Sequence, residues 1–315
     1  MSKIPVYIAG DSNIFMPGVV CLNSIKVRNP DIYEYYMCFD GADLTVDKKI
    51  ILEKYGIKFL DSKCLKFAES VFSVGTMKEG SWPKEVIFNW LVPNYFHLKG
   101  YQVAIKIDYD VICLSQWNWK ELEPGSCLFS ARYWNQNLSK DGVSQDIFTK
   151  LNVSPSNKYF NVGFCVINLD KFVHLKFFEK FIEIYRDLLN LKFVSAAEQV
   201  AISLAITSLK ADIRQIPSGY NQRVTTLPEL DSNGKSYIKN LHFITSNKPW
   251  KPLSFKYLRH YVDKGNRSHL YMYRSIWINE ALKLPEARFY IDLKKMSEIE
   301  YIDMMTMVFN EIYSN

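Results

Sequence analysis

The sequence predicts an α/β fold in which a mixed, mostly parallel β-sheet is flanked by helices. Two observations support this prediction. Strand and helix patterns alternate along the first half of the chain, and two apolar strands run almost directly into aspartates, Asp11 and Asp108. A length of 315 residues is enough to bury a full core, and 48% hydrophobic with 23% charged residues is ordinary for a globular protein.

Short apolar runs in the first half predict strands, and apolar residues at helical spacing predict helices. In chain order these are a strand at Val6–Ala9, a helix at Gly18–Val27, a strand at Tyr35–Phe39, a helix at Asp47–Tyr55, a strand at Ile57–Leu60, a helix at Lys84–His97 and a strand at Val103–Ile107. Ligands of such sheets bind beyond the carboxyl ends of the strands. Asp11 and Asp108 are therefore expected to face one cleft.

The second half of the chain has a more mixed pattern. Its predicted elements are strands at Cys127–Ala131, Gly163–Leu169, Ile213–Ile216 and Leu241–Ile244, and helices at Phe172–Leu191 and Ala196–Leu209. The last stretch, Ser297–Asn315, combines four acids with apolar residues and contains no Lys or Arg. It predicts a terminal helix that packs on the body of the protein or on a partner.

Charge and cysteine usage narrow the functional class. The net charge of +6 is not gathered in a recognisable nucleic-acid-binding module, so nucleic acid is not an expected partner. Such a charge suits a site that holds phosphates. The six cysteines contain no CxxC pair, and neither a leader segment nor an apolar run of the roughly 20 residues of a membrane span is visible. A cytoplasmic location is expected.

The strongest local signal for chemistry is Asp108-Tyr109-Asp110, which follows an apolar strand. Two carboxylates at this spacing can bind one divalent cation, and the cation can stabilise a diphosphate leaving group. An acidic turn is the commoner explanation of an isolated pair. Downstream, His242 offers a third ligand and Lys248 an ammonium for a phosphate, although alone they suggest a core histidine and a solvated charge. Together these residues predict a metal-diphosphate site.

Four sequence blocks in order carry a family resemblance. They are Val6-Tyr7-Ile8-Ala9-Gly10-Asp11-Ser12-Asn13, the strand before Asp108 with Trp82-Pro83 and Val92-Pro93 upstream, Tyr159-Phe160-Asn161-Val162-Gly163-Phe164-Cys165-Val166-Ile167-Asn168-Leu169, and His242-Phe243-Ile244-Thr245-Ser246-Asn247-Lys248-Pro249-Trp250. Over roughly residues 4–252 the chain resembles the retaining glycosyltransferases of family 8, which include bacterial lipopolysaccharide glycosyltransferases and the glycogenins. The resemblance implies a GT-A fold, with residues 1–250 as the nucleotide-sugar-binding catalytic domain and residues 251–315 as a helical C-terminal extension.

The resemblance also implies roles for individual residues. Asp108, Asp110 and His242 would bind Mn²⁺ or Mg²⁺, and Lys248 would contact the diphosphate of a UDP-sugar donor. The remaining residues would surround the donor: Ala9, Asp11 and Asn13 at the uracil and ribose, Asn161 and Glu198 at the sugar, and Gln199 near the anomeric carbon. From the residues alone, a helix N-terminus is the favoured explanation of Glu198 and Gln199, and Asn161 also suits a buried amide that is hydrogen-bonded to the backbone.

The expected reaction is transfer of a hexose-type sugar from the UDP-sugar to a hydroxyl of a glycan acceptor, lipid-linked or polysaccharide, with retention. A nucleotidyltransferase or sugar-nucleotide hydrolase is an alternative. So is a weak or inactive nucleotide-sugar-binding or glycan-binding protein, because Trp90, Val200 and Thr245 depart from the family pattern. The segment from Lys248 to Arg274 carries seven Lys or Arg against one acid. It suits a solvated face and a peripheral membrane or anionic-acceptor contact equally. The transferred sugar and the oligomeric state stay open.

Overall fold

The structure is a computed structural model that describes residues 3–29, 32–65, 84–140, 143–189, 197–226, 237–244, 248–251 and 268–291. The chain divides into two compact units. The first unit comprises Met1–Phe15, Asn29–Tyr109 and Trp117–Pro217, and the second comprises Met16–Arg28, Asp110–Gln116 and Ser218–Asn315. The predicted boundary near residue 250 stays a prediction.

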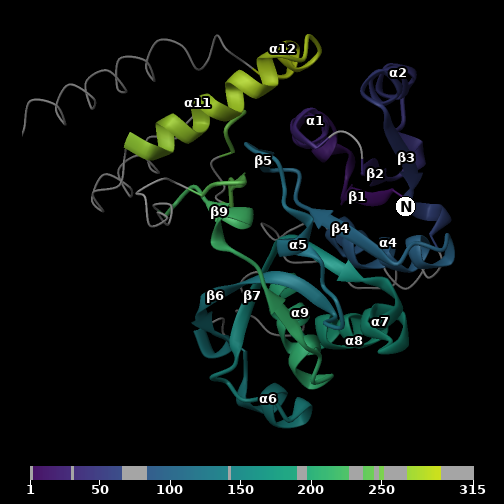
Figure 1. The fold of residues 1–315 in the computed structure, drawn as a ribbon. Coiled ribbons are helices and arrows are strands. Elements are labelled where there is room, and N and C mark those ends of the chain that lie inside the picture. Colours follow the sequence, from purple (N-terminus) through teal and green to yellow (C-terminus); the bar gives the residue numbers. More distant parts are fainter. Residues whose placement is uncertain are drawn as a thin grey trace, which may run out of the picture. The chain divides into compact units, whose positions relative to one another are not determined.

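The first unit is built on a seven-stranded sheet of order β3-β2-β1-β4-β7-β6-β8 (Figure 1). Its strands are β1 (Ile4–Ala9), β2 (Tyr33–Phe39), β3 (Ile57–Asp61), β4 (Val103–Ile107), β6 (Phe129–Asn137), β7 (Lys158–Asn168) and β8 (Ile213–Gln215). The pairings of β1 with β2 and β4, of β2 with β3 and of β6 with β8 are parallel. Only β7 runs antiparallel to its neighbours, β4 and β6. The predicted mixed, mostly parallel sheet flanked by helices is confirmed.

The helices of the first unit begin and end at recognisable signals. They are α2 (Val46–Tyr55), α4 (Phe88–Leu98), α5 (Trp119–Leu122), α6 (Gln145–Leu151), α7 (Leu169–His174), α8 (Phe177–Leu189) and α9 (Ala197–Ser208). The side chain of Thr45 accepts a hydrogen bond from Lys48 N at the start of α2, and Gly56 ends that helix at φ 64°. Helices α4, α7 and α9 pack on the sheet, and α8 lies beside α9 (Figure 1).

Two helix predictions need correction. The single helix predicted over Phe172–Leu191 is wrong, because the chain breaks between α7 and α8, where Lys176 adopts a left-handed φ of 49°. The helix predicted from Lys84 starts as a 3₁₀ turn over Lys84–Ile87 and becomes α-helical only at Phe88. Ala196, the first residue of the helix predicted over Ala196–Leu209, lies outside the described residues, as do Trp82 and Pro83.

The second unit contains a small sheet of order β5-β10-β9. Its elements are α1 (Phe15–Arg28), β5 (Val111–Cys113), β9 (Gln222–Arg223), β10 (Asn240–His242), α11 (Ser268–Leu282) and α12 (Ala287–Tyr290). Arg28 on α1 pairs with Glu280 on α11 at 2.7 Å. The terminal helix predicted at Ser297–Asn315 lies outside the described residues. Among the helices that the structure describes, none combines the length and the apolar character needed to cross a bilayer.

Candidate active site

The carboxyl edge of the first unit's sheet positions Asp108. Strands β1 and β4 are parallel with Tyr7 opposite Lys106, which brings Ala9 and Asp108 to the same edge. The backbone N–H of Asp108 donates to the carbonyl of Gly163 at 2.8 Å. Asn161 Oδ1 in turn accepts the N–H of Gly163 at 3.0 Å, within an irregularity of β7. Neighbouring strands thus fix the backbone on which the Asp108 carboxylate is carried.

The small sheet of the second unit holds Asp110 beside His242. Strands β5 and β10 are antiparallel with His242 opposite Val111, the residue after Asp110. The N–H of Phe243 donates to the carbonyl of Asp110 at 2.9 Å and continues this pairing. The side chains of Asp110 and His242 are about 5% and 4% exposed. Burial at this level means that their charges and lone pairs need partners within the site.

The hydrogen bonds of His242 suit a metal ligand. Its Nδ1 lies 2.9 Å from Asn221 Oδ1, and because this oxygen only accepts, Nδ1 carries the proton. In the tautomer with the proton on Nδ1, the lone pair of Nε2 faces Asp110 Oδ1 at 3.3 Å. Oδ1 is buried and has no hydrogen-bond partner among the described residues. Two facing lone pairs need a cation or a proton between them. In metal-bound histidines, the ring nitrogen that does not bind the metal typically donates a hydrogen bond to an oxygen, as Nδ1 does here.

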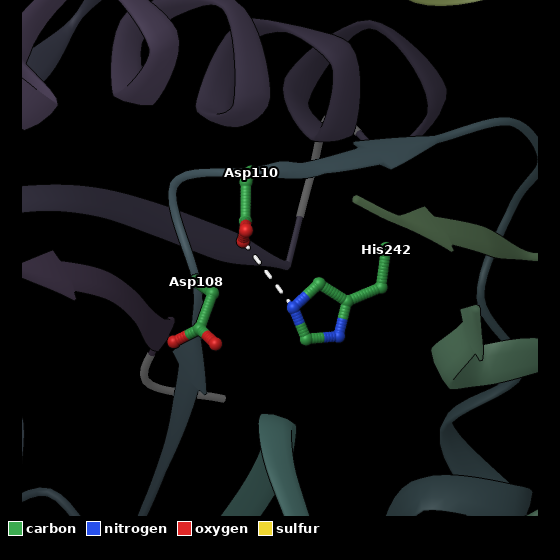
Figure 2. A group of neighbouring side chains, drawn as sticks. All are labelled: Asp108, Asp110 and His242. Atoms are coloured by element: carbon green, nitrogen blue, oxygen red, sulfur yellow. Dashed lines mark ion pairs between the residues drawn. The ribbon is translucent and has the colours of Figure 1, made fainter. Parts of the chain in front are cut away.

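Asp108 is the third residue that could contribute a metal-ligand atom. It precedes Asp110 by only two residues, so the chain itself keeps the two carboxylates close. One ligand atom each from Asp108, Asp110 and His242 lie within 4.8 Å of one another (Figure 2). Figure 2 shows Asp110 directed toward the imidazole, with the ion pair dashed. Two carboxylates and one imidazole suit Mn²⁺ and also accept Mg²⁺.

Lys248 is the counter-ion of Asp110. Its ammonium contacts Asp110 Oδ2 and donates to the carbonyl of Phe243 at 2.8 Å, and the residue is 5% exposed. Burial by itself would raise the pKa of Asp110, but the charge of Lys248, together with the contact to His242, outweighs it and holds this pKa well below its usual range. Asp110 is therefore ionised at neutral pH, and Lys248 is not a solvated surface charge.

The chain matches the family model described as Glycosyl transferase family 8 over residues 5–254. It belongs to glycosyltransferase family 8. A search of curated protein sequences finds no match. The family model therefore identifies the protein as a glycosyltransferase.

Solved structures of low sequence identity share the GT-A fold. The bifunctional glycosyltransferase WbbM is 16% identical with a TM-score of 0.63, and the match covers 94% of this chain and 52% of that one. This chain thus spans about half of WbbM. The galactosyltransferase LgtC is 15% identical with a TM-score of 0.58 over 91% and 100% of the two chains. GlyE of Streptococcus pneumoniae TIGR4 is 16% identical with a TM-score of 0.53 over 90% and 64%.

One charged residue beside this site, Lys106, was not predicted from the sequence. Lys106 on β4 is 1% exposed, and its ammonium contacts Asp108 Oδ1 and donates to the carbonyl of Val162 at 2.8 Å. Burial would lower the pKa of Lys106, but the charges of Asp108 and Glu198 raise it above its ordinary value. The available signal was a lysine inside the otherwise apolar strand Val103–Ile107. Asn221 was missed as well, because nothing in the sequence links it to His242.

Glu198 lies in the same group as Lys106. Trp90 Nε1 donates to Glu198 Oε1 at 2.5 Å, so this carboxylate in the first turn of α9 is hydrogen-bonded to an indole on α4. Burial raises the pKa of Glu198 to about 7, against the charge of Lys106, which lowers it. Trp90 itself is fully buried among aromatic rings, including that of Phe129. A carboxyl group that titrates near neutral pH is typical of functional sites.

The other predicted residues have the following places. Ala9 N donates to Asn89 Oδ1 at 3.2 Å. Asp11 caps the turn after β1 and accepts from the backbone and side chain of Asn13 at 3.0 and 3.1 Å. Gln199 Oε1 is buried and accepts no hydrogen bond within the described part of the chain. Of the residues that depart from the family pattern, Val200 is fully buried and Thr245 lies outside the described residues.

Proposed function

We propose that this glycosyltransferase moves a hexose-type sugar from a UDP-sugar to a hydroxyl of a glycan acceptor, with retention at the anomeric carbon. The family supports sugar transfer. The observation that carries the proposal is the arrangement of His242, whose Nδ1 is committed to Asn221 while Nε2 faces Asp110 at 3.3 Å. A buried carboxylate and imidazole in this arrangement need a cation or a proton between them, and the nearby carboxylate of Asp108 supports the cation.

In this proposal Asp108, Asp110 and His242 hold Mn²⁺, or Mg²⁺ in its place. The bound cation would stabilise the negative charge that develops on the departing UDP. Lys248 would exchange its contact with Asp110 for one with the diphosphate, since a divalent cation replaces the charge that it now supplies. Ala9, Asp11 and Asn13 would contact the uracil and ribose from the carboxyl end of β1.

Three residues would surround the donor sugar. Glu198 would bind sugar hydroxyls, and with a pKa of about 7 its carboxyl group can donate or accept a hydrogen bond near neutral pH. Gln199 would place its amide near the anomeric carbon, consistent with a buried Oε1 that has no hydrogen-bond partner in the described part of the chain. Asn161 would face the sugar from β7. In a front-face mechanism, the leaving phosphate accepts the proton of the acceptor hydroxyl.

A weakly active or inactive sugar-nucleotide-binding protein is the second candidate. The observation in its favour is Trp90, which is fully buried and carries no charge where the family often has Arg or Lys. A nucleotidyltransferase or sugar-nucleotide hydrolase would use a similar cation site. Product analysis separates these activities, because they release a glycoside, a phosphodiester, or free sugar with UDP.

The first experiment is thermal unfolding with a panel of sugar nucleotides, with and without Mn²⁺. A ligand at about 100 times its Kd stabilises the native state by about 2.7 kcal/mol. We expect a Mn²⁺-dependent shift with UDP-sugars that Asp110→Asn abolishes together with transfer. The matched control Asp187→Asn, which removes a partly exposed carboxylate paired with Lys150, should keep both the shift and the transfer. An unchanged Mn²⁺-dependent shift in Asp110→Asn would refute the cation site.

A further inference from the structure

Lys106 is a buried cation in the middle of a sheet. It lies opposite Tyr7 on β1 and opposite Cys165 on β7, so strands cover it on both sides. A buried ammonium without partners is strongly unfavourable, and an apolar residue would suit this position better. The presence of a lysine therefore indicates that its charge is used.

The contacts of Lys106 fix its ammonium group in place. Its three N–H donors are matched by three partners: Asp108 Oδ1, the carbonyl of Val162 at 2.8 Å and the face of the Trp90 ring, whose centroid is 5.7 Å away. The carbonyl of Val162 lies in the part of β7 where the register shifts, and the residues there have no pairing partner on β6. These contacts hold Lys106 in the core, so it is not placed to bind a substrate itself.

The ion pair with Lys106 weakens the attraction of Asp108 for a divalent cation. The Asp108 side chain is 31% exposed, whereas that of Lys106 is 1% exposed, so a cation reaches the carboxylate from the side away from the lysine. Such a cation is attracted by one negative charge and repelled by a fixed positive charge behind it. Asp110 is likewise paired, with Lys248. Each carboxylate of the site therefore already has a lysine as its counter-ion.

We propose that Lys106 is a positioning residue, a permanent counter-ion of Asp108 that makes binding of the divalent cation depend on a bound nucleoside diphosphate. The proposal rests on the proposed function above. Without the diphosphate, the two lysines offset the charge of the two carboxylates, and free cation binds weakly. The phosphates add the missing negative charge, so cation and nucleotide each raise the affinity of the other by the same factor.

The test is titration of Mn²⁺, followed by electron paramagnetic resonance of the free ion, with and without UDP. Wild type should bind Mn²⁺ at least about tenfold more tightly with UDP. Lys106→Met should bind Mn²⁺ alone at least about tenfold more tightly than wild type, and UDP should then add less. Lys58→Met is a matched control, since Lys58 also pairs with a carboxylate, Glu34, and lies over a ring, that of Tyr36 at 5.3 Å. It should behave as wild type does.

Each outcome bears on one proposal. Equal Mn²⁺ affinity with and without UDP in wild type overturns the inference, even if Lys106→Met does not fold. So does a Lys106→Met protein that folds and shows the affinity and UDP dependence of wild type. If instead Asp110→Asn retains full Mn²⁺ binding, the cation site of the proposed function fails. Loss of binding in Asp110→Asn with no change in Lys106→Met refutes only the role of Lys106.

Discussion

Replacing Glu198 by glutamine is expected to stabilise the folded protein above pH 7 while lowering sugar transfer. The pKa of Glu198 is raised from an ordinary value of 4.5 to about 7 because burial disfavours the charged carboxylate. At about 1.4 kcal/mol for each pH unit, this difference corresponds to about 3 kcal/mol. The residue as a whole is partly exposed, so we take this figure as an upper limit. Glutamine keeps an oxygen that can accept the bond from Trp90 Nε1.

The sign follows from proton binding. Between pH 4.5 and about pH 7 the folded protein retains the Glu198 proton and the unfolded chain does not, so this group lowers the free energy of unfolding as pH rises. Above pH 7 the loss is complete. Glutamine does not titrate, so the Glu198→Gln variant does not lose this stability. The difference in the free energy of unfolding between the variant and wild type should grow from near zero at pH 4.5 to at most about 3 kcal/mol at pH 8.

Urea unfolding followed by circular dichroism at pH 5 and pH 8 measures this advantage. Glu183→Gln is a suitable control, because Glu183 lies on the exposed face of α8, 50% exposed and paired with Lys180. The control should show no comparable pH-dependent gain. If the advantage of Glu198→Gln is the same at both pH values, the carboxyl group does not hold its proton in the folded state, and the reasoning from burial is wrong.

Two further outcomes are expected. Asn221→Leu removes the partner of His242 Nδ1 and should weaken Mn²⁺ binding in the presence of UDP by about 10- to 100-fold. Mn²⁺ titration measures the affinity, and circular dichroism should show little change in secondary structure. Unchanged affinity would show that Asn221 is not needed to orient the imidazole. Lys176→Gly relieves a left-handed φ of 49° between α7 and α8 and should raise the free energy of unfolding by up to about 1 kcal/mol in urea, whereas a loss of stability would mean that the lysine side chain contributes more than the backbone strain removes.

Local patterns were sufficient for the first four strands of the large sheet and for the paired aspartates. Strand β4 was predicted with its observed bounds, Val103–Ile107, and α2 was predicted to within one residue. Such predictions succeed because apolar runs, caps and turn glycines act over a few residues. The break at Lys176 was missed because the residue is not one that normally marks a left-handed turn.

The assembly of the site was decided by contacts between distant segments. The sequence by itself determined that Asp108 and Asp110 follow an apolar strand and that His242 and Lys248 lie downstream. Only the tertiary structure showed that β5, β9 and β10, each two or three residues long, form the sheet that holds His242 beside Asp110. A strand was predicted at Leu241–Ile244, where β10 lies, but β5 and β9 are too short to show a periodicity, and no local pattern indicated which strands pair.

The group around Lys106 shows the same division. The sequence determines that a lysine interrupts an apolar strand, but its neighbours Trp90, Val162 and Glu198 come from three other elements, α4, β7 and α9. The antiparallel insertion of β7 between β4 and β6 brings the Val162 carbonyl to Lys106. Strand order depends on which apolar faces pack together, and this packing involves the whole core. The sequence alone therefore identifies the residues of this group, but only the tertiary structure shows that they are in contact.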